Sequence, residues 1–205
     1  MKKLFGILKP KKQPIVVVSG LPRSGTSMMM KMLEAGGIPP ITDNIRTADD
    51  DNPKGYYEFE RVKKLKDGDV SWVPEAQGKA VKVISALLEH LPAAYEYRVI
   101  FMRRAMPEIL ASQKRMLVNR GEDPDKVSDE EMTRLYEKHL AKIESWLRAQ
   151  ENFRVLYIHY NKILQNPAPY VSQINAFLGN RLDTQKMAQV VDPSLYRQRK
   201  EKVSG

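Results

Sequence analysis

The chain has 205 residues, of which 42% are hydrophobic and 29% are charged, a composition that fits a globular protein and excludes a wholly disordered one. Lys and Arg exceed Asp and Glu by 34 to 25, and this formal net charge of +9 favours anionic partners such as nucleotides, nucleic acid, phosphorylated or sulfated molecules, or membrane surfaces. Cysteine is absent, which excludes disulfides and thiolate metal sites, and the three histidines are too scattered to predict a multi-histidine metal site.

Strands and helices alternate along the predicted chain. Apolar, β-branched runs predict strands over residues 14–19, 80–84, 97–102 and 153–160. Apolar residues at helical spacing predict helices over 26–34, from 107 to about 120, behind a capping box at Ser128 and Glu131, and over 167–178. Alternating strands and helices form βαβ units. We therefore predict an α/β fold with three α/β/α layers and a mostly parallel sheet.

No internal repeat or linker divides the sequence, so we predict a single domain over residues 1–205, with a basic leader (1–13) and a basic tail (191–205). Residues 39–60 lack periodicity and predict a long loop. The apolar stretch of the leader is too short for a signal peptide, which needs about 7–15 apolar residues, and for a membrane-spanning helix, which needs about 20. The sequence therefore predicts a cytoplasmic protein, with contact of the leader to acidic lipid as the alternative.

A glycine-rich turn joins the first predicted strand to the first predicted helix. The segment from Gly20 to Ser27, GLPRSGTS, has the Walker A spacing of its glycines and a terminal hydroxyl residue. Thr26 occupies the place of the lysine that neutralises triphosphate in that motif, and Arg23 is the only cation in the loop. The segment predicts a P-loop-like anion site rather than magnesium triphosphate chemistry. A βα turn without chemical purpose is the alternative.

The segment from Pro22 to Ser27 resembles the 5′-phosphosulfate loop of the sulfotransferases that use 3′-phosphoadenosine 5′-phosphosulfate (PAPS). Cytosolic members carry lysine at the position of Arg23, whereas tyrosylprotein and many bacterial members carry arginine. In the same family a strand ends in an arginine, and a serine eight positions later joins it at the 3′-phosphate. Arg104 and Ser112 have this spacing, since 112 − 104 = 8, and Arg103 is the alternative arginine. An arginine at the carboxyl end of a parallel strand also lies at the edge where such sheets bind ligands.

A third segment, residues 155–167 and on to Gly179, resembles the strand and helix near the end of these enzymes, although the family often has an acidic residue where Asn161 stands. The resemblance extends from residue 15 to about 180 and is looser over 39–78. It implies that Arg23 would stabilise the phosphosulfate and its leaving group. The backbone amides of Ser24, Gly25 and Thr26, with the hydroxyls of Thr26 and Ser27, would hold the 5′-phosphate.

The general base is not where cytosolic members carry it. They have a lysine and, two positions later, a histidine on the strand that here contains Lys82, so Ile84 occupies the histidine position. Other branches use a glutamate, and Glu58 is our first candidate and Glu60 the second. Two residues apart on an extended segment, they would share one face. Solvated loop carboxylates are the alternative for both, and Lys82 either faces the site or projects from the strand.

The basic tail resembles the late segment with which cytosolic members close over the 3′-phosphate, which makes Arg197, Arg199 and Lys200 candidate cofactor ligands. A frayed basic terminus is the alternative. The resemblance as a whole predicts an enzyme that moves the sulfuryl group of PAPS to a hydroxyl or amine acceptor, needs no metal and does not bind nucleic acid. We expect residues 39–78 to determine the acceptor. The rival hypotheses are a P-loop nucleotide kinase or hydrolase and a non-catalytic basic anion-binding module.

Overall fold

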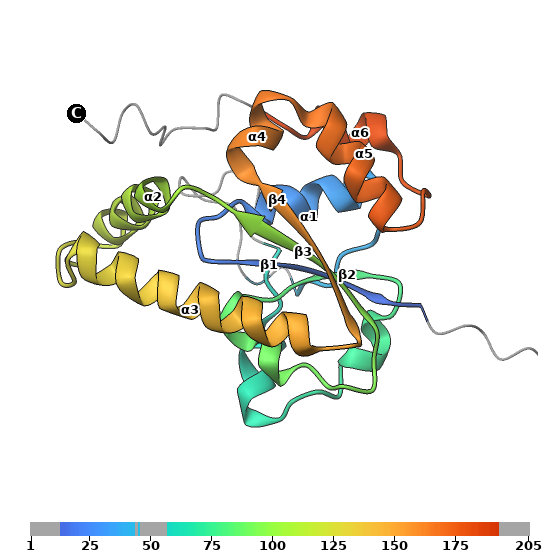
Figure 1. Cartoon of the computed structure of the whole chain (residues 1–205), viewed down its shortest axis with the longest axis horizontal. Helices are drawn as coiled ribbons and strands as arrows, with labels where there is room; N and C mark the ends of the chain where they lie inside the picture. The colour runs from blue at the N-terminus through green and yellow to red at the C-terminus, as the bar shows by residue number, and fades with distance from the viewer. Residues whose placement is uncertain (1–12, 44, 46–56, 193–205) are drawn as a thin grey trace, which may run out of the picture.

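Four parallel strands form the centre of the structure, a computed structural model that describes residues 13–43, 45 and 57–192 (Figure 1). The sheet order is β2-β1-β3-β4, and each neighbouring pair is parallel. The strands are β1 (Ile15–Gly20), β2 (Ala80–Lys82), β3 (Tyr97–Arg103) and β4 (Phe153–His159). The predicted parallel sheet is confirmed, although β2 ends two residues earlier than we expected.

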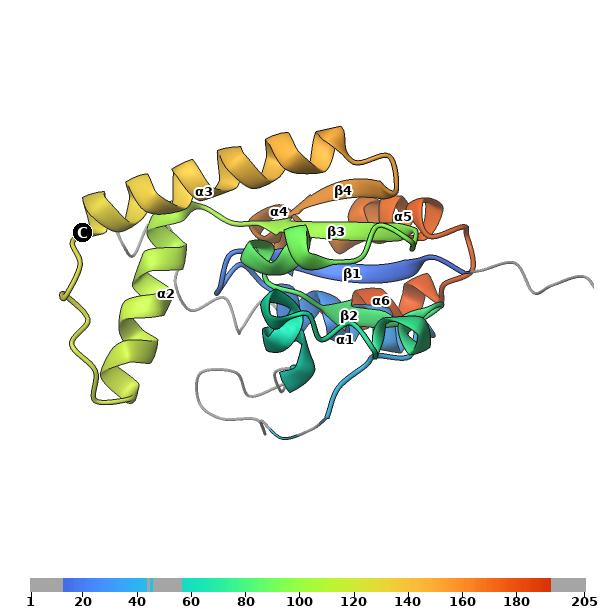
Figure 2. The ribbon, with the colours of Figure 1, turned by 90° about the horizontal axis from the view of Figure 1, so that it is seen from below.

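Helices cover both faces of the sheet, which confirms the three predicted layers (Figure 2). One layer contains α1 (Thr26–Ala35), α4 (Tyr160–Gln165), α5 (Pro167–Phe177) and α6 (Thr184–Gln189). The opposite layer contains α3 (Asp129–Ala149) and the 3₁₀ helices η1 (Glu60–Asp67), η2 (Val73–Ala76) and η3 (Ser85–His90). Helix α2 (Met106–Asn119) stands beyond the carboxyl ends of the strands.

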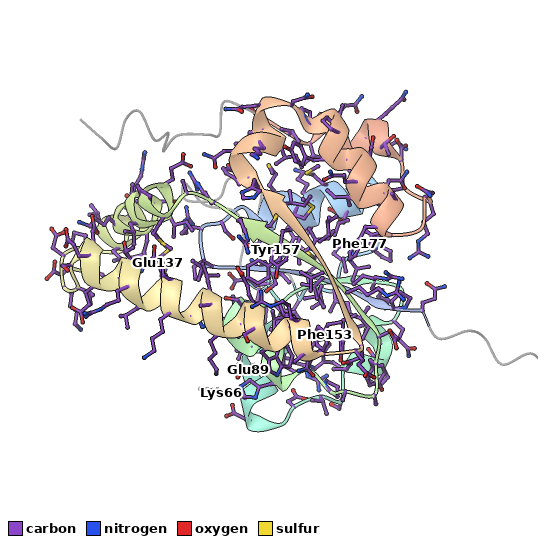
Figure 3. All side chains as sticks on the ribbon, viewed as in Figure 1. Lys66, Glu89, Glu137, Phe153, Tyr157 and Phe177 are labelled. Atoms are coloured by element: carbon purple, nitrogen blue, oxygen red, sulfur yellow. The ribbon has the colours of Figure 1, made fainter. Side chains whose placement is uncertain are left out.

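Successive side chains of a strand point to opposite faces of the sheet, and this alternation explains why the protein has two apolar cores. In β1, Val16 and Val18 pack with the methionines of α1, whereas Ile15 and Val17 pack with the 3₁₀ helices and α3. Figure 3 labels Phe153 of β4, which lies near α3, and Phe177 of α5, and these belong to the two separate apolar clusters. All six residues of β1 are buried, as the continuous β-branched run predicts for a central parallel strand.

The layer built from 3₁₀ helices is where the fold departs from prediction. Within residues 39–78, for which we predicted no helix, residues 60–67 and 73–76 are helical, and Trp72 between them is buried and packs edge-to-face on Phe59. Helices of one or two turns have no long apolar period to detect. The predicted cap of α3 is confirmed, because the Ser128 side chain accepts a hydrogen bond from the amide of Glu131. Across the described ranges, no helix is both long enough and apolar enough to cross a membrane.

Candidate active site

The turn between β1 and α1 has a backbone that only a few residue types accept. Gly25, the N-cap of α1, has φ +98°, and a Cβ placed on it would lie 2.3 Å from Cδ2 of Tyr160. Arg23 also adopts a left-handed backbone conformation, with φ +66°, which is uncommon for residues other than glycine. The loop therefore approaches α4 too closely for any side chain at position 25, and it holds Arg23 in a strained conformation of the kind found at binding sites.

Of the three hydroxyl residues at the start of α1, one is buried and two are half-buried. The buried Ser24 hydroxyl donates to the carbonyl of Leu21 at 2.7 Å, and its amide points to the same oxygen at 3.3 Å, so Ser24 holds the turn itself. Thr26 and Ser27 are half-buried in the first turn of α1. Because the first amides of a helix have no partner within it, this end of α1 suits an anion.

The side chain of Arg23 joins the two predicted phosphate sites. Its Nε donates to Oγ of Ser112 at 2.9 Å, across 89 positions of sequence, and Ser112 is buried on α2. Ser112, which we expected at the 3′-phosphate together with Arg104, is thus also in contact with Arg23. Sequence spacing does not reveal this contact.

Arg104 is held at the same edge, and its side chain is only 8% exposed. Its Nε donates to Oε2 of Glu108 at 2.9 Å, and its Nη1 donates to the carbonyl oxygen of Arg23 at 3.0 Å. Its guanidinium also lies over the Tyr160 ring, 4.7 Å from the centroid. Arg104 thus contacts the turn between β1 and α1 (residues 20–27, which we call the phosphate loop). It does so from the end of β3, where the strand-end motif predicted it.

The alternative arginine, Arg103, faces α3. It pairs with Glu144 and lies over the ring of Tyr157, 4.4 Å from the centroid. Both arginines line one cavity of about 420 Å³ at the carboxyl ends of β3 and β4. His159 and Lys162 add basic groups to its wall, and burial, together with the charges of Lys162 and Arg103, lowers the pKa of His159. The charged groups of its wall are thus mainly basic, much of the rest of the wall is apolar, and Leu21 and Ser24 of the turn between β1 and α1 also line it.

The predicted carboxylates meet the predicted lysine near the end of β2. Lys82 is 11% exposed, and its Nζ lies 3.7 Å from Oε1 of Glu58. Lys63 connects the two glutamates, since its Nζ lies 3.9 Å from Oε2 of Glu58 and 2.6 Å from Oε1 of Glu60. The expectation that both glutamates share a face agrees with this arrangement, but only Glu58 contacts Lys82.

A serine–histidine contact beside these residues was not predicted. Oγ of Ser85 lies 2.8 Å from Nε2 of His139, which α3 contributes from 54 positions away. Lys82 is in register with Val18 of β1, so Ser85 follows β2 close to where β1 enters the phosphate loop. Burial, with the charge of Lys142, lowers the pKa of His139. No spacing signal in the sequence links residues so far apart.

Ile84 occupies the position at which we expected cytosolic members to carry histidine, and it is 45% exposed.

The predicted ligands Arg197, Arg199 and Lys200 lie outside the described residues, as do nearly all of the basic leader and tail. Within the described part of the chain, no group of three or more His, Asp or Glu side chains is arranged to hold a metal ion.

Comparison with known proteins agrees with this geometry. The family described as "Sulfotransferase domain" matches residues 13–204, so the chain belongs to the sulfotransferase family, whose PAPS-dependent members transfer a sulfuryl group. No curated protein sequence matches the chain.

Solved structures with the same fold include three sulfotransferases. The sulfotransferase domain of the Synechococcus PCC 7002 olefin synthase has a TM-score of 0.55 at 16% identity, over 93% of this chain and 86% of that one. Mouse SULT7A1, solved with PAP, has a TM-score of 0.54 at 18% identity, over 88% and 62%. STF1 from Mycobacterium tuberculosis H37Rv has a TM-score of 0.57 at 15% identity, over 95% and 76%. At these identities the likeness concerns the fold.

Proposed function

We propose that this sulfotransferase moves the sulfuryl group of PAPS to a hydroxyl or amine acceptor, in the cytoplasm. The observation that carries the proposal is the convergence of Arg23, Ser112 and Arg104 on the start of α1. These groups and the helix end are donors, which suits a ligand with several anionic oxygens. The lack of cysteine is in keeping with a reducing compartment.

The phosphate loop and its neighbours fit the anionic groups of PAPS. The amides of Gly25 and Thr26 and the hydroxyls of Thr26 and Ser27 would hold the 5′-phosphate, and Arg104 with Ser112 would face the 3′-phosphate. Gly25 adds no side chain at this helix end, and the Tyr160 ring lies against it. The mouse relative was solved with PAP, the desulfated product, which supports this choice of ligand.

PAPS supplies an activated sulfuryl group, and its transfer leaves negative charge on the 5′-phosphate. Arg23 would stabilise that charge, because a fixed cation in a partly buried site is strongly effective where charge develops. Glu58 would take the proton of the acceptor hydroxyl or amine as the new bond to sulfur forms. Lys82 beside Glu58 would hold that carboxylate in place.

The test is calorimetric titration with PAP in EDTA, beside ADP. We expect micromolar binding of PAP and much weaker binding of ADP, because ADP lacks the 3′-phosphate. An acceptor screen with PAPS, divided into sugars, peptide tyrosine, lipids and small alcohols, would follow.

Two other results of the same titration would overturn the proposal. Binding of ATP alone, and only when magnesium is restored, would favour a nucleotide kinase or hydrolase. Weak, equal binding of PAP and ADP with a steep dependence on salt would favour a basic anion-binding module instead.

A further inference from the structure

Glu108 is a fully buried carboxylate that the proposed chemistry does not use. It lies in the first turn of α2 with a side-chain exposure of 0%. Burying a carboxylate costs free energy unless its oxygens are paired. Both oxygens are paired here: Oε2 accepts from Nε of Arg104 at 2.9 Å, and Oε1 accepts from Nδ2 of Asn161 at 2.7 Å.

These two contacts join three segments that are far apart in the sequence. Arg104 lies at the turn from β3 to α2, and it also donates to the carbonyl of Arg23 in the phosphate loop. Asn161 lies in the first turn of α4, next to Tyr160, whose ring lies beneath Arg104 and against Gly25. Glu108 is therefore the acceptor at which the phosphate loop, α2 and α4 are tied together.

Fold stability alone does not account for a charged group at this point. A buried ion pair is often replaced by apolar residues of similar size without loss of stability. A carboxylate does something that an apolar residue cannot, because it fixes the direction of a guanidinium. An arginine held in one conformation before its ligand arrives loses little freedom on binding.

We propose that Glu108 is a positioning residue for the 3′-phosphate: it orients Arg104 and so sets the preference for nucleotides that carry a 3′-phosphate. This inference rests on the proposed function, in which Arg104 faces that phosphate. Asn161 completes the arrangement, because a carboxylate only accepts hydrogen bonds and the amide supplies the second donor. An acidic residue at position 161, as the family often has, would bring a second carboxylate to the same oxygen.

The experiment compares Glu108→Gln with the unaltered chain by calorimetric titration with PAP and with 5′-AMP. Glutamine keeps the shape, but an NH2 donor replaces one of the two oxygens, so either Arg104 or Asn161 loses its acceptor. We expect PAP to bind about tenfold more weakly, the scale of one charge-assisted hydrogen bond, and 5′-AMP to change less than about twofold. A ratio of the two affinities that stays at its original value would overturn the inference.

A control for general destabilisation is Val171→Ala, which truncates a buried side chain of α5 in the apolar core. It is expected to lower the melting temperature and leave the affinity ratio unchanged. If V171A lowered the ratio as much as E108Q does, the effect would be structural and the positioning role would be wrong.

Asn161→Ala tests the same arrangement from its other end, and decides the matter if the Glu108 variant fails to fold. We expect the ratio to fall in the same direction by about threefold, because Arg104 keeps its pair. An unchanged ratio in that variant would overturn the inference. If the unaltered chain itself bound PAP and 5′-AMP equally, the proposed cofactor would be wrong, whereas discrimination that both variants retain would overturn only the role of Glu108.

Discussion

Two regions at the carboxyl edge of the sheet are built differently. On the phosphate side (Gly20–Ser27, Arg104, Glu108, Ser112 and Asn161), buried and part-buried groups are joined by hydrogen bonds, most of them between segments distant in sequence. On the carboxylate side (Glu58, Glu60, Lys63 and Lys82), the contacts are ion pairs of up to 3.9 Å, and Lys63 is 61% exposed. The exposed ion pairs of Lys63 contribute little to stability.

The comparison teaches that the two sides meet different demands. A ligand with fixed phosphate positions is best met by a prearranged set of donors. In the proposed function Glu58 must take a proton and meet an acceptor, and a carboxylate that lysines hold at 3.7–3.9 Å is suited to that role. The two sides should therefore respond differently to substitution, the phosphate side through cofactor affinity and the carboxylate side through turnover.

The largest expected effect is on the phosphate side. Arg23→Ala should lower sulfuryl transfer by about a thousandfold, because it removes the cation next to the charge that develops on the leaving phosphate. Turnover with an acceptor from the screen is the measurement, with circular dichroism to confirm that the fold is retained. Arg23→Lys, which keeps the charge, is the matched control and should retain more activity. Full turnover in R23A would remove Arg23 from the mechanism.

On the carboxylate side, Glu58→Gln should lower turnover by about a hundredfold, since it removes the proton acceptor. Its affinity for PAP should stay within about twofold, which separates this side from the other. Glu60→Gln is the matched control, because Glu60 contacts Lys63 but not Lys82 in the structure. A greater loss of turnover in E60Q than in E58Q would make Glu60 the proton acceptor. Normal turnover in both variants would exclude both glutamates and make His139 the next candidate.

The rigidity of the phosphate side can be tested by adding one methyl group. Gly25→Ala should lower the free energy of unfolding by about 2 kcal/mol more than Gly37→Ala, measured by urea denaturation. Both glycines have φ +98°, but a Cβ at Gly25 would meet Tyr160 at 2.3 Å, whereas a Cβ at Gly37 would have nothing within 4 Å. Equal losses in the two variants would mean that the loop has room to move away from α4.

The smallest expected effect is a dependence of stability on pH. Burial lowers the pKa of His139 and of His159 in the folded state. The unfolded chain therefore binds these protons at higher pH, and the free energy of unfolding should fall as pH decreases through about 6.5. His139→Gln should flatten this slope, whereas the exposed His90→Gln should leave it unchanged. A slope that is the same in all three proteins would contradict the lowered pKa of His139.

Sequence predicted the phosphate side better because its signals are local. The strand, the glycine turn and the start of α1 follow one another without a break, and Arg104 follows a strand whose apolar run is unmistakable. The partner of Ser112 could not be predicted, because it depends on the direction of the Arg23 side chain in three dimensions. Glu108 lies four positions after Arg104, a helical pairing distance that was available as a signal.

The carboxylate side resisted prediction for a physical reason. Glu60 and Lys63 lie in the 3₁₀ helix η1, which is too short to show a period, and the neighbouring contact of Ser85 with His139 spans 54 positions. Sequence patterns report local conformation, whereas contacts of this kind are decided when the layers pack. Glu58 and Lys82 were both named as candidates, and the fold was needed to bring them together.

The 3₁₀ helices η1, η2 and η3 are expected to unfold locally more readily than the central strands. They are short, with poorer hydrogen-bond geometry than α-helices, whereas β1 and β3 are buried at the centre of the sheet. Amide protons in η1 and η2 should therefore exchange with solvent through small openings that leave β1 and β3 protected. Residues 60–76 would then adapt to acceptors of different shape while the phosphate loop keeps its form, so that acceptor choice can change without refolding the protein.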